Sequence, residues 1–226
     1  MAHATATPRL PLASILGAHF SETVKGKTVV DFGCGHGDDV VQLSQLGAAL
    51  AIGLEVRPEL VAENQARHAV PGVQFATQLS SDLAAKVDLV ISVDAFEHFD
   101  DPAFILKEMQ RCLRPGGEVW ISFGPPWRHP RGGHLFSVFP WAHLLLSEKA
   151  LIRWRAQYFH DGATRFNEVA GGLNKMTLGE FDALIAQSSL KLLDLQCRPI
   201  WGRPLVQKLL GREFGTAMVL ARLQKV

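Results

Sequence analysis

The chain has 226 residues, and its 23 lysines and arginines nearly balance its 22 aspartates and glutamates. So even a balance gives no support for bulk nucleic-acid binding or for a strongly acidic partner. Its three cysteines, Cys34, Cys112 and Cys197, form no Cys-x-x-Cys pair, which argues against a disulfide framework and a structural zinc site. The expectation is one domain that buries roughly 70% of its unfolded surface, in a reducing cytoplasm.

Neither a secretory signal nor a membrane-spanning segment is expected. The start, from Met1 to Ile15, lacks a basic region and is interrupted by two prolines. The longest apolar stretch, from Leu135 to Leu146, contains Pro140 and His143 and is far shorter than the ~20 residues that span a bilayer.

Strands and helices are predicted to alternate through the first half of the chain. Val29 and Val30 suit a buried strand, and Pro58, Asp101 and Pro102 stand where helices begin. Later strands are expected at 48–54, 73–76, 87–93 and 118–123, with helices at 38–46, 58–68 and 101–113. This alternation is typical of a parallel sheet with helices on both faces, and ligands in such sheets bind at the carboxyl ends of the strands.

Residues 29–37 read Val-Val-Asp-Phe-Gly-Cys-Gly-His-Gly, a buried strand followed by a glycine-rich loop. Glycines there let the backbone turn sharply and approach a ligand closely. A dinucleotide fingerprint would need a third glycine or an alanine where Asp38 stands. Asp38 and Asp39 would also oppose a pyrophosphate at the start of the next helix. A nicotinamide dinucleotide is therefore disfavoured.

The motif resembles the first motif of class I S-adenosylmethionine (SAM) dependent methyltransferases, in which an acid precedes Gly-x-Gly-x-Gly. The matching residues are Asp31, Gly33, Gly35 and Gly37. The segment from Asp94, Asp-Ala-Phe-Glu-His-Phe, and the Leu-Arg-Pro-Gly-Gly turn at 113–117 also look like that family. The resemblance implies a Rossmann-like α/β fold with seven mostly parallel strands. Beyond residue 124 the pattern is only general, with a helix at 177–188, a strand at 190–197 and an antiparallel last strand at 216–223.

The resemblance also assigns cofactor-binding residues. Asp31 would attract the positively charged end of SAM, and Cys34 would act as a spacer whose backbone touches the cofactor. Glu55 ends the second expected strand, where its carboxylate can accept bonds from both ribose hydroxyls. Asp94 and Ala95 would border the methionine end. The adenine contact is left open among four residues after the third strand: Gln78, Ser80, Ser81 and Asp82.

His98 is the candidate general base, with Glu97 beside it, because both follow the fourth strand directly and histidine titrates near neutral pH. The alternative is that the pair only shapes the loop and that orientation alone accelerates transfer. No metal is expected, since Gly124-Pro125 stands where metal-dependent relatives carry an Asp-Asn pair. The histidines at 129, 134, 143 and 160 also lack the spacing of a zinc site.

Residues 125–176 are expected to form an inserted subdomain within the single 1–226 domain, because ~2 to 6 residues would suffice for this connection. We interpret it as a lid and acceptor pocket with a helix at 147–158. Gly132-Gly133 and Gly171-Gly172 would act as hinges, and a stripe from Trp141 to Trp154 would form core. The candidate acceptor contacts are Trp127, His129, His134, Phe136 and His160. A packing or homodimer interface is the alternative.

The sequence thus predicts a methyltransferase that acts on an apolar or aromatic small molecule. One alternative is a non-enzymatic binding or scaffold protein with the same fold. Another is a lipid or isoprenoid methyltransferase at a membrane surface, with 135–146 dipping into lipid. A nucleic-acid or protein methyltransferase is disfavoured, because no Asn-Pro-Pro-Tyr-like signature follows the fourth strand.

Overall fold

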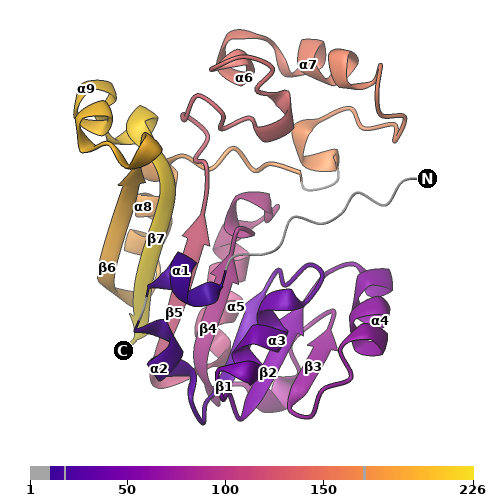
Figure 1. Ribbon diagram of the computed structural model, residues 1–226, viewed down its shortest axis with the longest axis vertical. Helices are drawn as coiled ribbons and strands as arrows, with labels where there is room; N and C mark the ends of the chain where they lie inside the picture. The colour runs from indigo at the N-terminus through magenta and orange to yellow at the C-terminus, as the bar shows by residue number, and fades with distance from the viewer. Residues whose placement is uncertain (1–10, 18, 170–171) are drawn as a thin grey trace.

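The computed structural model describes residues 11–17, 19–169 and 172–226. Residues 1–10, on which the expectation about a secretory signal largely depends, lie outside this part. One seven-stranded sheet has the order β3-β2-β1-β4-β5-β7-β6 (Figure 1). The strands are β1 (Thr28–Phe32), β2 (Leu50–Leu54), β3 (Val73–Ala76), β4 (Val87–Val93), β5 (Leu113–Phe123), β6 (Leu190–Pro199) and β7 (Thr216–Lys225). Only β7 runs against both of its neighbours, so the predicted fold class is confirmed.

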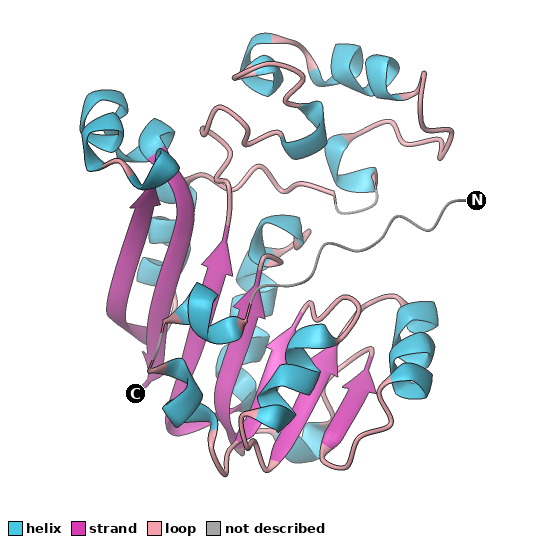
Figure 2. Ribbon diagram, in the orientation of Figure 1, coloured by secondary structure: helices cyan, strands magenta, loops and turns pink. Residues whose placement is uncertain are grey.

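Helices cover both faces of the sheet (Figure 2). One face carries α1 (Leu12–Leu16), α2 (Phe20–Val24), α3 (Asp38–Gln45) and α4 (Pro58–Arg67), whose apolar side chains share one core cluster. The other face carries α5 (Pro102–Cys112) and α8 (Leu178–Gln187), which share a second cluster.

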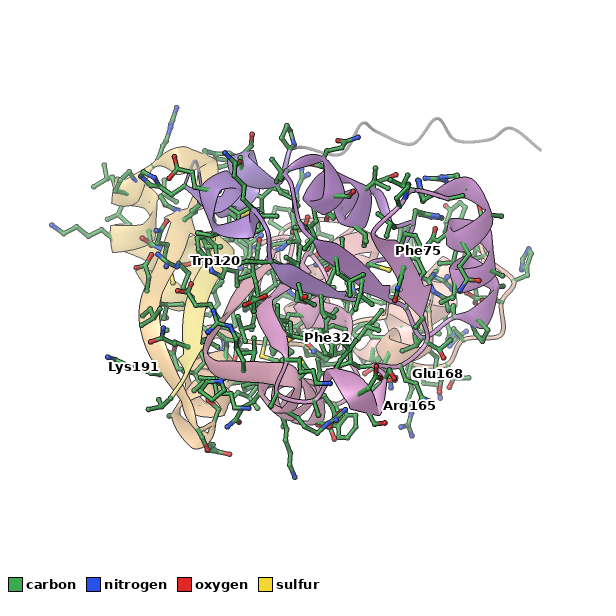
Figure 3. The ribbon with its side chains drawn as sticks, turned by 90° about the horizontal axis from the view of Figure 1, so that it is seen from below. Phe32, Phe75, Trp120, Arg165, Glu168 and Lys191 are labelled. Carbon is green, nitrogen blue, oxygen red and sulfur yellow. The ribbon has the colours of Figure 1, made fainter. Side chains whose placement is uncertain are left out.

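Alternation along each strand separates these two cores. Val29 belongs to the first cluster, whereas its neighbour Val30 belongs to the second, as the two-residue period of a strand requires. Trp120 and Phe75 accordingly lie on the side of α1 to α4, and Phe32 lies on the opposite side (Figure 3).

Two short helices before β1 were not predicted. Phe20 of α2 is fully buried, and its ring lies edge-on to Trp120 with the centroids 5.3 Å apart. Helices of five residues are marginal by themselves, so packing on the sheet rather than local periodicity stabilises them.

The boundary between α5 and β5 differs from the prediction. The helix ends at Cys112, and Leu113 already pairs with Val87, before a register shift that precedes the pairing of Leu89 with Glu118. Leu113 already has an extended backbone, and Pro115 disfavours a helical conformation at Arg114, so the chain continues as a strand.

Between β5 and α8, the described residues of the segment 125–176 form four short helices. The backbone N–H of Trp127 donates to the carbonyl of Met176 over 2.8 Å, which closes the base of the insertion. Its helices are η3 (His134–Phe136), α6 (Ala142–Leu145), α7 (Glu148–Arg155) and η4 (Phe166–Glu168). It has its own core of Phe136, Leu151, Ile152, Phe166, Val169 and Leu173. It lies over the carboxyl ends of β4 and β5 (Figure 1).

Several details of the insertion correct the sequence analysis. The helix expected at 147–158 is the shorter α7. Gly132 is buried against the Trp127 and Pro126 carbonyls, and a Cβ on Gly133 would come within 2.5 Å of His143. Both positions are therefore close-packing sites and not hinges. Gly171, in the second proposed hinge, lies outside the described residues.

The C-terminal part contains the helix and two strands expected there, with α9 (Pro204–Gly215) added between β6 and β7. Gly211 interrupts this helix with a non-helical backbone. Among the described residues, no helix has the length and apolar character needed to cross a membrane.

Candidate functional site

A cavity of about 790 Å³ opens at the carboxyl ends of β1, β2 and β4. It brings together the glycine loop, the end of β2, the segment after β3 and the segment after β4. The predicted residues that line it are Gly33, Cys34, Gly35, Glu55, Gln78, Asp94, Ala95 and His98. Its volume lies within the ~300 to 1,000 Å³ that ligand sites occupy.

All three loop glycines have positive φ angles, but they differ in the space around the position that a Cβ would occupy. A Cβ on Gly33 would lie 2.7 Å from the Cβ of Ala95, and one on Gly37 would lie 2.6 Å from the Phe75 ring. A Cβ on Gly35 would meet nothing within 4 Å, and Gly35 lines the cavity. Two of the glycines are thus required by packing, while Gly35 leaves open space for a ligand.

Backbone and side-chain bonds fix this loop. The N–H groups of Gly33 and Cys34 both donate to the carbonyl of Leu54, over 2.9 and 3.0 Å. The Asn64 amide donates to the carbonyl of Gly35 over 2.8 Å, and Asn64 is fully buried. Sequence reasoning missed Asn64. The signal for it was a polar residue on the inward face of α4, beside Leu60 and Val61.

Glu55 is buried at the end of β2, as predicted, but its carboxylate already has a partner. Arg57 donates to both carboxylate oxygens through its guanidinium, over 2.9 and 3.0 Å, and once more through its backbone N–H. Burial opposes ionisation of Glu55, but the bonds from Arg57 outweigh it and hold the pKa below its ordinary value. The Arg57 side chain is half exposed, so it can leave Glu55 with little loss of packing.

Cys34 does not have the environment of a nucleophile. Burial raises the pKa of its thiol well above the ordinary value, and the nearby carboxylates of Asp31 and Glu55 raise it further. The thiol therefore stays protonated, which leaves the backbone as the part of Cys34 that can serve a ligand.

Asp31 and Gly37 do not line the cavity. Asp31 is 2% exposed near the end of β1.

Asp94, at the end of β4, does line the cavity, with an exposed side chain and a left-handed backbone at φ +52°. Its N–H donates to the carbonyl of Ser122 over 2.8 Å, so β5 holds it in place.

Of the four residues that the sequence analysis leaves open for the adenine contact, only Gln78 is among those that line the cavity. Gln78 and its neighbours Thr77 and Leu79 line the cavity. Ser80 does not line the cavity, and its exposed hydroxyl donates to the carboxylate of Asp82. A contact of Ser80 with the cofactor stays a prediction.

His98 lies at the border between the cavity and the insertion. Its Nδ1 is 2.6 Å from the carbonyl of Gly172. A carbonyl only accepts, so Nδ1 must carry the proton, which leaves Nε2 as the acceptor in the neutral ring. The His134 ring lies edge-on to it, with centroids 5.5 Å apart.

Glu97 is a positioning residue rather than a group that reaches the cavity. It is 3% exposed, and its Oε1 accepts from the N–H of Gly124 over 3.1 Å. Its Oε2 is buried without a hydrogen-bond partner. Burial raises the pKa of Glu97 to about 7, so this carboxyl binds a proton more tightly than an exposed glutamate does. Glu97 does not line the cavity, and a direct catalytic role for it stays a prediction.

A second support for this segment comes from the insertion. The Asn174 amide donates to the carbonyls of Phe96 and Phe99, over 2.9 and 3.0 Å, and its N–H donates to the carbonyl of Glu97. These bonds fix η2 (Phe96–His98) against the insertion. No pattern in the sequence indicates this role of Asn174.

The five predicted acceptor contacts do not line the cavity. Phe136 is 1% exposed inside the core of the insertion, and the Trp127 ring packs on Phe166 and His143. The remaining three differ: His129 is buried with a pKa lowered to about 4 by burial, His134 contacts His98, and His160 is exposed. The insertion instead contributes Val169 and Gly172 to the cavity.

Comparisons with known proteins agree with this geometry. Residues 30–121, which run from β1 to β5, match the model of a family described as "Methyltransferase domain". A ubiquinone biosynthesis O-methyltransferase of Pseudomonas paraeruginosa is 30% identical over 125 residues, 53% of either chain. A probable phthiotriol/phenolphthiotriol dimycocerosates methyltransferase 2 of Mycobacterium ulcerans is 34% identical over 98 residues, 42% of this chain and 38% of that protein. The chain thus matches about half the length of the first relative.

Solved structures share the fold. An S-adenosylmethionine dependent methyltransferase from Mesorhizobium loti aligns with a TM-score of 0.57 at 20% identity, over 90% of this chain and 93% of that chain. A geranyl diphosphate methyltransferase in complex with SAM aligns with a TM-score of 0.58 at 17% identity, over 95% and 83%. The chain therefore has the fold of the class I SAM-dependent methyltransferases. Residues 30–121 match a methyltransferase-domain model, in agreement with the resemblance predicted from the motifs.

Proposed function

We propose that this protein binds SAM in the cavity and transfers its methyl group to an apolar or aromatic small molecule that enters beside His98. The observation that carries the proposal is the continuity of the cavity, which runs from Gly35 and Glu55 to His98. The match of residues 30–121 to a methyltransferase domain supports it independently.

The residues present fit the cofactor. Gly35 leaves space at the loop, and Glu55 provides carboxylate oxygens for ribose hydroxyls once Arg57 moves. Gln78 offers an amide for adenine, and Asp94 offers a negative charge for the ammonium group of the methionine end. When bound, SAM supplies an electrophilic methyl group on a sulfonium.

The protein's own contribution is orientation and proton removal. His98, held by the Gly172 carbonyl, has its Nε2 available to accept a proton from a hydroxyl or amine acceptor. Asn174 and Glu97 hold the segment that carries His98, so its ring is fixed before an acceptor arrives.

The acceptor class follows from the lining of the cavity. Phe99, Phe104 and Ile105 supply apolar surface near His98, and Val169 adds apolar surface from the insertion. The names of the relatives, which refer to ubiquinone biosynthesis and to geranyl diphosphate, favour the same class. We take the acceptor to be a single small molecule and no nucleic acid.

Transfer of labelled methyl from SAM to a panel of hydroxylated aromatic compounds tests the proposal. We expect His98→Ala to lower the rate by about 100-fold and to change its pH dependence, because base catalysis is typically worth that much. His19→Ala, an exposed histidine on the N-terminal segment, should leave the rate unchanged.

Two results would change this account. A His98→Ala rate within tenfold of the original, with the same pH dependence, would show that orientation alone suffices. If SAM binds but no acceptor in the panel or in a small-molecule extract is labelled, the scaffold alternative gains support.

A further inference from the structure

Exposed apolar side chains gather at one end of the molecule. α6 and α9 both lie at the end to which the carboxyl ends of β1 to β5 point (Figure 1). Leu145 of α6 is 71% exposed, and Leu205 and Leu209 of α9 are 66% and 77% exposed. The expectation that the stripe beginning at Trp141 forms core is thus wrong for Leu144 and Leu145. We call the exposed parts of 135–146 and 201–210 the α6–α9 surface.

The outward direction of α9 is fixed by its hydrogen bonds. The Gln207 amide donates to the Cys197 carbonyl and to the Thr216 hydroxyl, over 3.2 and 2.8 Å, which places this residue against the sheet. Leu205, Lys208 and Leu209 follow helical spacing on the other side, and all three are exposed. Trp201, just before the helix, is 81% exposed. This arrangement places a large aromatic side chain and a lysine beside two leucines.

Arg128 lies between the regions that carry the two segments. The Arg128 guanidinium lies 5.9 Å from the centre of the Phe214 ring in α9. The indole N–H of Trp141, the residue that precedes α6, donates to the Arg128 carbonyl over 3.1 Å. Arg128 thus contacts both the residue that precedes α6 and the last turn of α9.

Charge distinguishes this end from the rest of the chain. Residues 126–161 and 198–213 carry nine lysines and arginines against three acidic residues, Glu148, Asp161 and Glu213, in a chain whose net charge is +1. Asp161 pairs with the buried Arg155 over 2.7 Å. Glu148 is itself paired with Lys175 over 2.7 Å. The exposed basic residues include Arg128, Arg131, Lys149, Arg153, Arg203 and Lys208.

We propose that the α6–α9 surface docks on an anionic lipid membrane. Apolar side chains interleaved with lysine and arginine are the combination that inserts at a headgroup boundary, with the bases on lipid phosphates. A second copy of the chain is a poorer occupant, because pairing this surface with itself would place like charges together. The proposal stands on the surface alone, independent of methyl transfer.

Flotation of the full chain with vesicles tests the proposal, using phosphatidylcholine alone or mixed with phosphatidylglycerol. We expect flotation with the anionic vesicles and about tenfold weaker binding to phosphatidylcholine alone or at high salt. Leu205→Ser with Leu209→Ser, and separately Arg203→Glu with Lys208→Glu, should each reduce binding about tenfold or more. Leu192→Ser with Leu193→Ser is the matched control, since these exposed leucines lie near the start of β6, at the opposite end.

Circular dichroism establishes that each variant is folded, so a loss of flotation reports on the surface. Absence of flotation with anionic vesicles would overturn the proposal, as would an equal loss in the Leu192 and Leu193 control. Light scattering measures the oligomeric state and so tests the alternative occupant, a second copy of the chain. If the protein is a dimer and Leu205→Ser with Leu209→Ser abolishes it, the surface is a dimer interface instead.

Discussion

At the scale of single residues, Glu55 lies where the sequence analysis expects it, at the end of β2, but its carboxylate has a partner that was not expected. Its position at the end of β2 follows from the topology of a parallel sheet. Its ion pair with Arg57, two residues later, depends on the local backbone and rotamer and was not predicted. Cofactor binding is therefore expected to exchange one set of partners for another.

We predict opposite effects for the two members of this pair. Glu55→Ala should weaken binding of S-adenosylhomocysteine about 10- to 100-fold, because a charged hydrogen bond is worth ~1.5 to 3 kcal/mol. Arg57→Ala should leave affinity unchanged or raise it, since it removes a competitor for the carboxylate. Calorimetric titration measures both, with exposed Glu59→Ala as the control. Equal losses in both variants would show that Arg57 is itself a cofactor contact.

The buried Glu97 carboxyl predicts a pH-dependent stability. Its pKa of about 7 lies above the ordinary 4.5, so the folded protein holds the proton more tightly than the unfolded chain. This contribution is complete below pH 4.5 and is lost as the pH rises to about 7. Glu97→Gln keeps the neutral form at every pH, and should be more stable than the original at pH 8 by about 1 to 3 kcal/mol.

Urea unfolding at pH 5 and pH 8 measures this difference. The advantage of Glu97→Gln over the original protein should be larger at pH 8 than at pH 5, while exposed Glu63→Gln should show no such change. An advantage that does not depend on pH would mean that Glu97 is not the titrating group.

At the scale of elements, sequence reasoning succeeded where the signal was local and failed where packing decided. The glycine loop, the helix caps and the strands of the first half follow from residues adjacent in the chain. The short helices α1 and α2 form through burial of Phe20 and its neighbours, which no local period shows. The aromatic residues of the insertion suggested a pocket, but Phe136 and Phe166 are used for its own core.

Removal of most of the insertion should leave cofactor binding intact if the residues at its two ends are kept. Asn174 and Met176, at the end of the insertion, must be kept, because Asn174 holds η2 and Met176 is buried in the larger core cluster. We expect replacement of residues 128–173 by a short glycine-serine turn to keep S-adenosylhomocysteine binding within a few fold and to abolish methyl transfer. Trp127 and Met176 are already hydrogen-bonded, so the turn needs to span only a small gap.

Labelled-methyl transfer and calorimetric titration on this shortened protein give the two readouts. Transfer that survives the replacement would place the acceptor pocket outside the insertion. Loss of cofactor binding would indicate instead that the insertion is needed to hold the loop after β4.

At the scale of the whole molecule, the end of the sheet that carries the cavity also carries the insertion, α9 and most of the exposed apolar and basic side chains. The alternating strands and helices predict this end as the ligand site, since parallel strands direct their carboxyl ends together. They do not predict how the insertion folds over it, because contacts such as Arg128 with Phe214 join segments far apart in the sequence.

The central claim is that the loop around Gly35 binds SAM, and calorimetric titration with S-adenosylhomocysteine and with NAD tests it most directly. We predict that the protein binds S-adenosylhomocysteine well below millimolar and gives no heat with NAD. We also predict that Gly35→Ala, whose new Cβ meets no protein atom within 4 Å, keeps the fold but weakens binding about tenfold or more, through backbone strain and lost ligand space. Binding of NAD, or no binding of S-adenosylhomocysteine below about millimolar, would contradict the account.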